Sequence, residues 1–152
     1  ERVMAAELLI QLAAAFFGTL CFALLFHVPH RHLWCCGIAG MTGWLFYWSM
    51  MQAQQSPVAA SLVAVIPLAV LTRVFAVARK APVTLFLIPG IFPLVPGAGI
   101  YYTMSLGLGG DVQAAVHKGL ETAGVAGSIA VAILLVSTIF RLVTAQNGKS
   151  RK

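Results

Sequence analysis

The sequence predicts an all-α integral membrane protein with five transmembrane helices, the fourth of which is broken by a segment rich in proline and glycine. Three observations lead to this fold class: the composition, the lengths of the apolar stretches and the placement of the basic residues. Of the 152 residues, 60% are hydrophobic and only 9% are charged, whereas an ordinary soluble domain carries about 25% charged residues. A soluble fold of this size could not bury so much apolar surface, but lipid can cover it.

Five apolar stretches are each long enough to cross roughly 30 Å of hydrocarbon at about 1.5 Å per residue. They run over residues 3–26, 33–51, 58–78, 83–108 and 120–143. Short polar or basic connections separate these stretches. Residues 1–145 therefore form one predicted transmembrane domain, and residues 146–152 are expected to be a basic, disordered tail.

The basic residues support five crossings and give them an orientation. With five crossings, eight basic residues share one side: Arg31, Arg73, Arg79, Lys80, Arg141, Lys149, Arg151 and Lys152. Only Arg2 and Lys118 fall on the other side. If the fourth stretch entered and returned without crossing, the division would be five against five and would indicate no orientation. Because cytoplasmic loops are enriched in Lys and Arg, we expect the N-terminus outside and the C-terminus in the cytoplasm.

The fourth stretch contains three prolines and three glycines between Pro89 and Gly99. Each proline removes a backbone donor and clashes with the preceding turn, so one straight helix cannot continue through them. We expect two half-helices joined by irregular backbone, the second beginning near Gly97. Such backbone at membrane depth must be buried in protein or line a polar cavity. The N-terminus of a half-helix can hold a carboxylate there, as in transporters, and Tyr101, Tyr102 and Thr103 would offer hydroxyls to a polar substrate. The alternative is a proline kink that only shapes helix packing.

The core Pro93-Leu94-Val95-Pro96-Gly97, followed by Tyr101 and Thr103, resembles the broken helix of the threonine/serine exporter family. The whole chain is similar to the small five-helix subunit of the split form of that family, which pairs with a larger membrane subunit. The Val28-Pro29-His30-Arg31 connection also resembles that subunit.

The resemblance implies a hetero-oligomeric, proton-driven exporter in the bacterial cell membrane, without a cofactor. It implies a small carboxylate-bearing substrate, either threonine and serine or a dicarboxylate such as succinate. The substrate site would then include Pro93, Pro96, Gly97, Gly99, Tyr101, Tyr102 and Thr103.

Four residues are candidates for proton coupling: Glu7, Asp111, His117 and Glu121. Glu7 lies inside the first apolar stretch, about a turn from its outer end, where it could also reach the headgroups. The other three surround the fourth connection. Asp111 and Glu121 could instead serve as a cap and a first-turn acid of the last helix.

Other patterns carry less functional information. The cysteines, Cys21, Cys35 and Cys36, read as small packing residues, and the histidines of the first connection lack the spacing of a zinc site. The aromatic cluster from Trp44 to Trp48 is typical of an interfacial belt. Small residues at Gly40 and Gly43, and at Gly124, Ser128 and Ala132, predict close helix contacts, within the chain or with a partner.

No P-loop, GxSxG or HExxH motif occurs in the sequence. Direct ATP drive and intramembrane enzyme chemistry are therefore not expected. A scaffold subunit with no transport path of its own remains the main alternative to an exporter subunit.

Overall fold

The computed structural model describes residues 2–149, with side chains for Met4 and residues 6–143. All regular structure in this range is helical. The elements are α1 (Arg2–Leu25), η1 (His30–His32), α2 (Leu33–Gln52), α3 (Pro57–Arg79), α4 (Thr84–Ile91), η2 (Phe92–Leu94), α5 (Gly97–Leu108) and α6 (Val112–Lys149). The first four residues of the predicted tail continue α6, and residues 150–152 lie outside the described range.

Local sequence signals set several helix ends. Ser56 caps α3 because its hydroxyl accepts a hydrogen bond from the Ala59 amide (3.3 Å), and Pro57 occupies the first helical position. Lys80 ends the same helix in the left-handed conformation, with φ of 50°. Asp111 caps α6, since its Oδ1 accepts from the Ala114 amide at 3.0 Å. This is the capping role that the sequence offered as the alternative to proton coupling.

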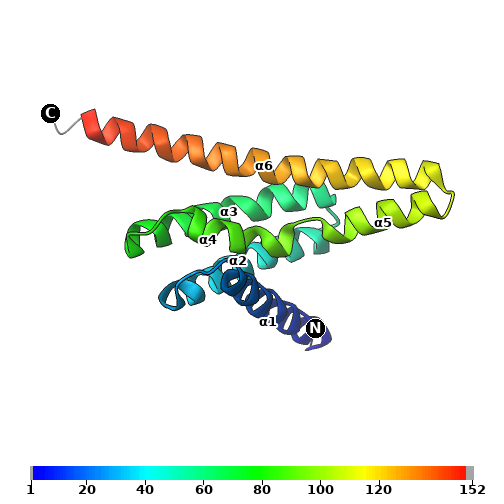
Figure 1. Cartoon of the computed structure of the whole chain (residues 1–152), viewed down its shortest axis with the longest axis horizontal. Helices are drawn as coiled ribbons and strands as arrows, with labels where there is room; N and C mark the ends of the chain where they lie inside the picture. Colours follow the sequence, from blue (N-terminus) through cyan, green and yellow to red (C-terminus); the bar gives the residue numbers. More distant parts are fainter. Residues whose placement is uncertain (1, 150–152) are drawn as a thin grey trace.

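The helices are arranged around α2 and α3. Helix α2 packs against α1, α3 and α4, and α3 also packs against α6. In Figure 1, α5 and α6 form a long hairpin that projects beyond the other helices, and α1 diverges from them toward its N-terminus. Helix α5 packs against α6, and none of its residues is buried. One core lies between α3, η2 and α6, and a second joins the first connection to α2 and α4.

Glycines allow the close approach of α2 to its neighbours. A Cβ at Gly40 would overlap the Thr19 side chain of α1, and one at Gly43 would lie 2.6 Å from Leu68 Cδ1 of α3. Gly124 of α6 faces Val58 of α3 in the same way, with 3.0 Å to its Cγ2. Both small-residue patterns of the sequence thus serve packing within the chain.

The chain is an all-α membrane protein. Within the described residues, three helices are long and apolar enough to span a bilayer alone: Ala6–Leu25, Pro57–Arg79 and Val112–Val143. The pair Thr84–Leu94 and Gly97–Leu108 qualifies as a fourth if it is one span, and the two parts meet at a bend of 44°. Helix α2 has 20 residues, but its glycines and polar aromatic residues lower its hydropathy. The count of five crossings therefore stays a prediction.

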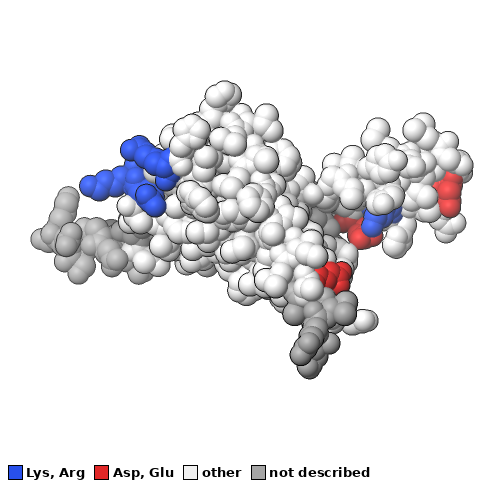
Figure 2. Space-filling model, turned by 90° about the horizontal axis from the view of Figure 1, so that it is seen from below, with Lys and Arg blue, Asp and Glu red and all other residues white. Residues whose placement is uncertain are grey.

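Charged side chains are segregated along the molecule. Figure 2 shows most of the Lys and Arg side chains gathered at one end and the Asp and Glu side chains toward the other. Many large apolar side chains are exposed on the helices; Leu9, Val77 and Leu134, for example, are 67%, 81% and 65% exposed. Such side chains suit contact with acyl chains.

Candidate functional site

The chain is interrupted between α4 and α5. Helix α4 ends at Ile91, η2 adds one tight turn, and Val95 is extended with φ −62° and ψ 129°. Pro96 precedes α5 and supplies no side-chain cap. The Gly97 amide donates to the Val95 carbonyl (2.7 Å). The first helical hydrogen bond of α5 runs from the Ile100 amide to the Pro96 carbonyl, at 3.1 Å. The amides of Ala98 and Gly99 have no such partner among the described residues, as expected for an uncapped helix start.

A cavity of about 340 Å³ lies beside this interruption. Small-molecule sites in proteins typically range from roughly 300 to 1,000 Å³. The cavity walls come from α2, α3, the interruption and α6: Trp44, Tyr47, Pro57, Ser61, Pro93, Leu94, Val95, Pro96, Ala98, Gly99, Tyr102, Lys118, Glu121, Thr122 and Val125. The uncapped amides of Ala98 and Gly99 therefore belong to residues of a cavity that a small polar molecule could fill.

An ion pair on α6 forms the charged wall of the cavity. Lys118 Nζ lies 3.0 Å from Glu121 Oε2, and the two side chains are 33% and 29% exposed. The Tyr47 phenol on α2 lies close enough to interact electrostatically with both charges. A site with an ammonium, a carboxylate and helix-start amides can bind both a negative and a positive group of one ligand.

The hydroxyls in the cavity wall fall into two classes. Ser61 donates to the Pro57 carbonyl (2.8 Å) and Thr122 to the Lys118 carbonyl (2.7 Å), so both hydroxyls satisfy their own helices. The phenols of Tyr47 and Tyr102 make no hydrogen bond to any described residue. These two phenols therefore remain able to bond a ligand.

The structure separates the predicted substrate residues into two groups. Pro93, Pro96, Gly99 and Tyr102 line the cavity. The other three, Gly97, Tyr101 and Thr103, do not. A Cβ at Gly97 would meet nothing within 4 Å, Tyr101 is 67% exposed, and the Thr103 hydroxyl donates to the Gly99 carbonyl at 2.7 Å.

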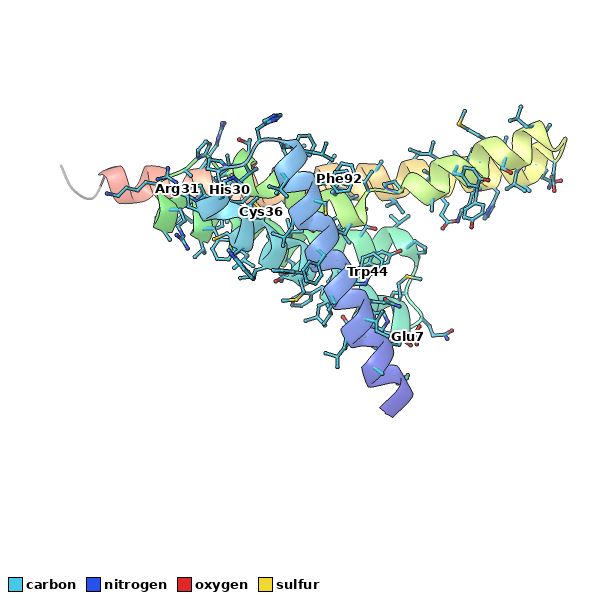
Figure 3. All side chains as sticks on the ribbon, turned by 60° about the horizontal axis from the view of Figure 1, so that its bottom comes forward. Glu7, His30, Arg31, Cys36, Trp44 and Phe92 are labelled. Carbon is cyan, nitrogen blue, oxygen red and sulfur yellow. The ribbon has the colours of Figure 1, made fainter. Side chains whose placement is uncertain are left out.

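The proton-coupling candidates are also dispersed. Of the four, Glu121 is the one in the cavity wall. Asp111 caps α6, and His117 is exposed on the same helix. Glu7 is exposed on the diverging part of α1, as Figure 3 shows.

Several cavity residues were not expected from the sequence as site residues. Trp44 and Tyr47 belong to the cluster that reads as an interfacial belt, yet both line the cavity. Trp44 Nε1 also donates to Gln11 Oε1 of α1 (3.1 Å), which fixes the indole. The sequence indicates for Lys118 only a place among the basic residues that orient the helices in the membrane. Its position three residues before Glu121, which places both side chains on one face of a helix, is the signal that could have identified the pair.

A second polar cluster lies at the opposite end of the molecule. His32 is 2% exposed, its Nε2 accepts from Arg31 Nε (3.0 Å), and its ring meets the Phe86 ring edge-on at 5.5 Å. Burial, together with Arg31 and Arg79, lowers the pKa of His32. The buried Nδ1 has no partner among the described residues. No group of three potential metal ligands occurs in the described part of the chain.

A cavity with one charged wall beside an interrupted helix pair, in an all-α membrane protein, is consistent with a membrane transport protein. The family model of the threonine/serine exporter, ThrE, matches residues 11–139. The chain therefore belongs to the threonine/serine exporter family, in agreement with the resemblance carried by the Pro93–Gly97 core. Neither a curated protein nor a solved structure matches the chain.

Proposed function

We propose that the chain is one subunit of a proton-driven exporter of small carboxylate-bearing metabolites, with threonine and serine as its main substrates. The observation that carries this proposal is the 340 Å³ cavity, which is lined by the Lys118–Glu121 ion pair and by Ala98 and Gly99, the residues with uncapped amides. Membership of the threonine/serine exporter family points to the same substrates. Secondary transporters use half-helix N-termini in this way to hold anionic groups without a dedicated cation.

In this proposal α4, η2 and α5 form one discontinuous crossing, and α1, α2, α3 and α6 form the other four. The N-terminus then lies outside the cell and the C-terminus in the cytoplasm of a bacterium. The support is electrostatic: Arg31, Arg79 and Lys80 lie at the ends of helices that would meet the cytoplasm, and Figure 2 shows no acidic side chain at that end of the face in view.

A larger membrane subunit would complete the transport path. Val95, in the irregular backbone, is 43% exposed, and Gly97 is exposed as well. Lipid cannot satisfy the polar groups of irregular backbone, so protein or a water-filled path should cover this side. Helix α5, which has no buried residue of its own, offers the partner a long contact surface.

Glu121 is our candidate for the proton carrier. It lines the cavity, so its protonation would change the charge of the site where substrate binds. Asp111 serves as a helix cap, and Glu7 and His117 lie on exposed surfaces outside the cavity. None of these three could act on the bound substrate directly.

The proposal is tested by deleting the gene and measuring intracellular metabolites after loading the cells with threonine-containing dipeptides. Threonine and serine should accumulate in the deletion strain and return to normal when the full-length gene is restored. Succinate, measured in the same samples, tests the dicarboxylate alternative. Collapse of the proton gradient should abolish export by the restored strain. Equal threonine levels in both strains would contradict the proposal and favour a scaffold subunit.

A further inference from the structure

Glu121 lines the cavity and has spare hydrogen-bonding capacity. Its Oε2 accepts from Lys118 Nζ at 3.0 Å, but its Oε1 accepts from no described residue. The side chain is only 29% exposed, so the carboxylate is partly withdrawn from solvent. A partly desolvated carboxylate with a free oxygen attracts a cationic donor.

Lys118 can move without leaving the cavity. Its ammonium has three donors, of which the structure uses one, and it ends a flexible four-carbon side chain. Ala98 and Gly99, whose amides are uncapped, line the same cavity. An anion at the start of α5 would therefore find amides on one side and an ammonium within the same space.

We infer that Glu121 binds the α-ammonium of the exported amino acid, and that Lys118 occupies this position when the site is empty. On substrate binding, Lys118 turns from Glu121 to the substrate carboxylate, which the Ala98 and Gly99 amides also hold. This inference rests on the proposed function and assigns the specificity of its site. A dicarboxylate lacks the ammonium and would place its second negative group against Glu121, which disfavours it.

The same carboxylate couples export to the proton. The titratable groups that line the cavity with Glu121 are Lys118 on α6, Tyr47 on α2 and Tyr102 on α5, while α3 contributes Ser61 and no titratable side chain. A proton from the outer solution binds the Glu121 carboxylate, and the substrate ammonium leaves with its own charge. When Glu121 releases the proton to the cytoplasm, the ammonium of Lys118 or of a new substrate pairs with the free carboxylate. One proton thus enters for each amino acid exported.

The test compares Glu121→Gln, Lys118→Met and the control Gln113→Ala, an exposed residue of α6 outside the cavity. Each full-length variant is expressed in the deletion strain, its amount in the membrane is measured, and export of threonine and succinate is followed. Glu121→Gln should lower threonine export by about tenfold to a hundredfold, as expected for loss of a charged hydrogen-bond partner. It should also raise the ratio of succinate to threonine exported. Lys118→Met should lower export of both, because both substrates carry a carboxylate.

Two further measurements make the result decisive. Residual threonine export by Glu121→Gln should no longer respond to an imposed proton gradient. The wild-type protein should not export 2,3-dihydroxybutyrate, in which a hydroxyl replaces the ammonium of threonine. This measurement uses no variant, so it does not depend on how a variant folds.

Wild-type threonine export by Glu121→Gln, or export of the hydroxy acid at the threonine rate, would overturn the inference while leaving the proposed function intact. Absence of threonine export by the wild-type protein would overturn both.

Discussion

Alanine at Gly99 and alanine at Gly97, two positions in the first turn of α5, should have opposite effects. A Cβ at Gly99 would lie 2.5 Å from Thr122 Oγ1, about 0.9 Å short of the 3.4 Å at which ordinary contacts begin. Thr122 cannot yield freely, because its hydroxyl donates to the Lys118 carbonyl at 2.7 Å. Helix α5 would have to move away from α6, and overpacking of this kind costs about 1–3 kcal/mol. A Cβ at Gly97 meets nothing within 4 Å, so Gly97→Ala should gain about 0.4–1 kcal/mol, because alanine restricts the unfolded chain more than glycine does.

The two variants are compared by thermal unfolding in detergent and by threonine export from the deletion strain. Gly99→Ala should unfold at a lower temperature and export less threonine, because displacement of α5 from α6 changes the shape of the cavity. Gly97→Ala should retain the wild-type unfolding temperature and threonine export. The double variant Gly99→Ala/Thr122→Ala should recover much of the stability, since it removes the atoms at 2.5 and 3.1 Å. If Gly99→Ala behaves like wild type, or if Gly97→Ala is the more harmful of the two, the described packing of α5 on α6 is wrong.

Two further predictions concern other parts of the molecule. Gly40→Ala should destabilise the α1–α2 contact by about 1–3 kcal/mol in thermal unfolding, because its Cβ would overlap the buried Thr19 side chain; Gly18→Ala, which meets nothing within 4 Å, serves as the control and should be neutral or slightly stabilising. The lowered pKa of His32 means that the unfolded chain takes up a proton at a higher pH than the folded chain. Its contribution to stability should thus be complete above about pH 6.5 and should be lost as the pH falls below that value. His32→Leu should flatten this part of the pH profile of the unfolding temperature, whereas an unchanged profile, or an equal effect of His30→Gln at the exposed neighbour, would contradict the role given to His32.

The sequence was sufficient for those features that depend on local chemistry. Long apolar stretches require lipid or a membrane-embedded partner wherever they lie, so the all-α membrane class follows from composition and length alone. Proline lacks an amide hydrogen in any context, so the interruption before Gly97 could be located to within a residue or two. Ser56 and Asp111 likewise cap their helices through neighbours only three residues away.

The site itself depended on which helices meet, and no local pattern contains that information. Trp44 and Tyr47 reach the cavity because α2 packs against α4 and η2, whereas their sequence context fits the membrane interface equally well. Lys118 and Glu121 complete the cavity because α6 turns back along α5. Helix periodicity fixes which face of a helix a side chain occupies, but only tertiary packing decides what that face contacts. For this reason the sequence determined the membrane fold class and the position of the break, while the composition of the cavity was decided by the packing of α2 and α6 around it.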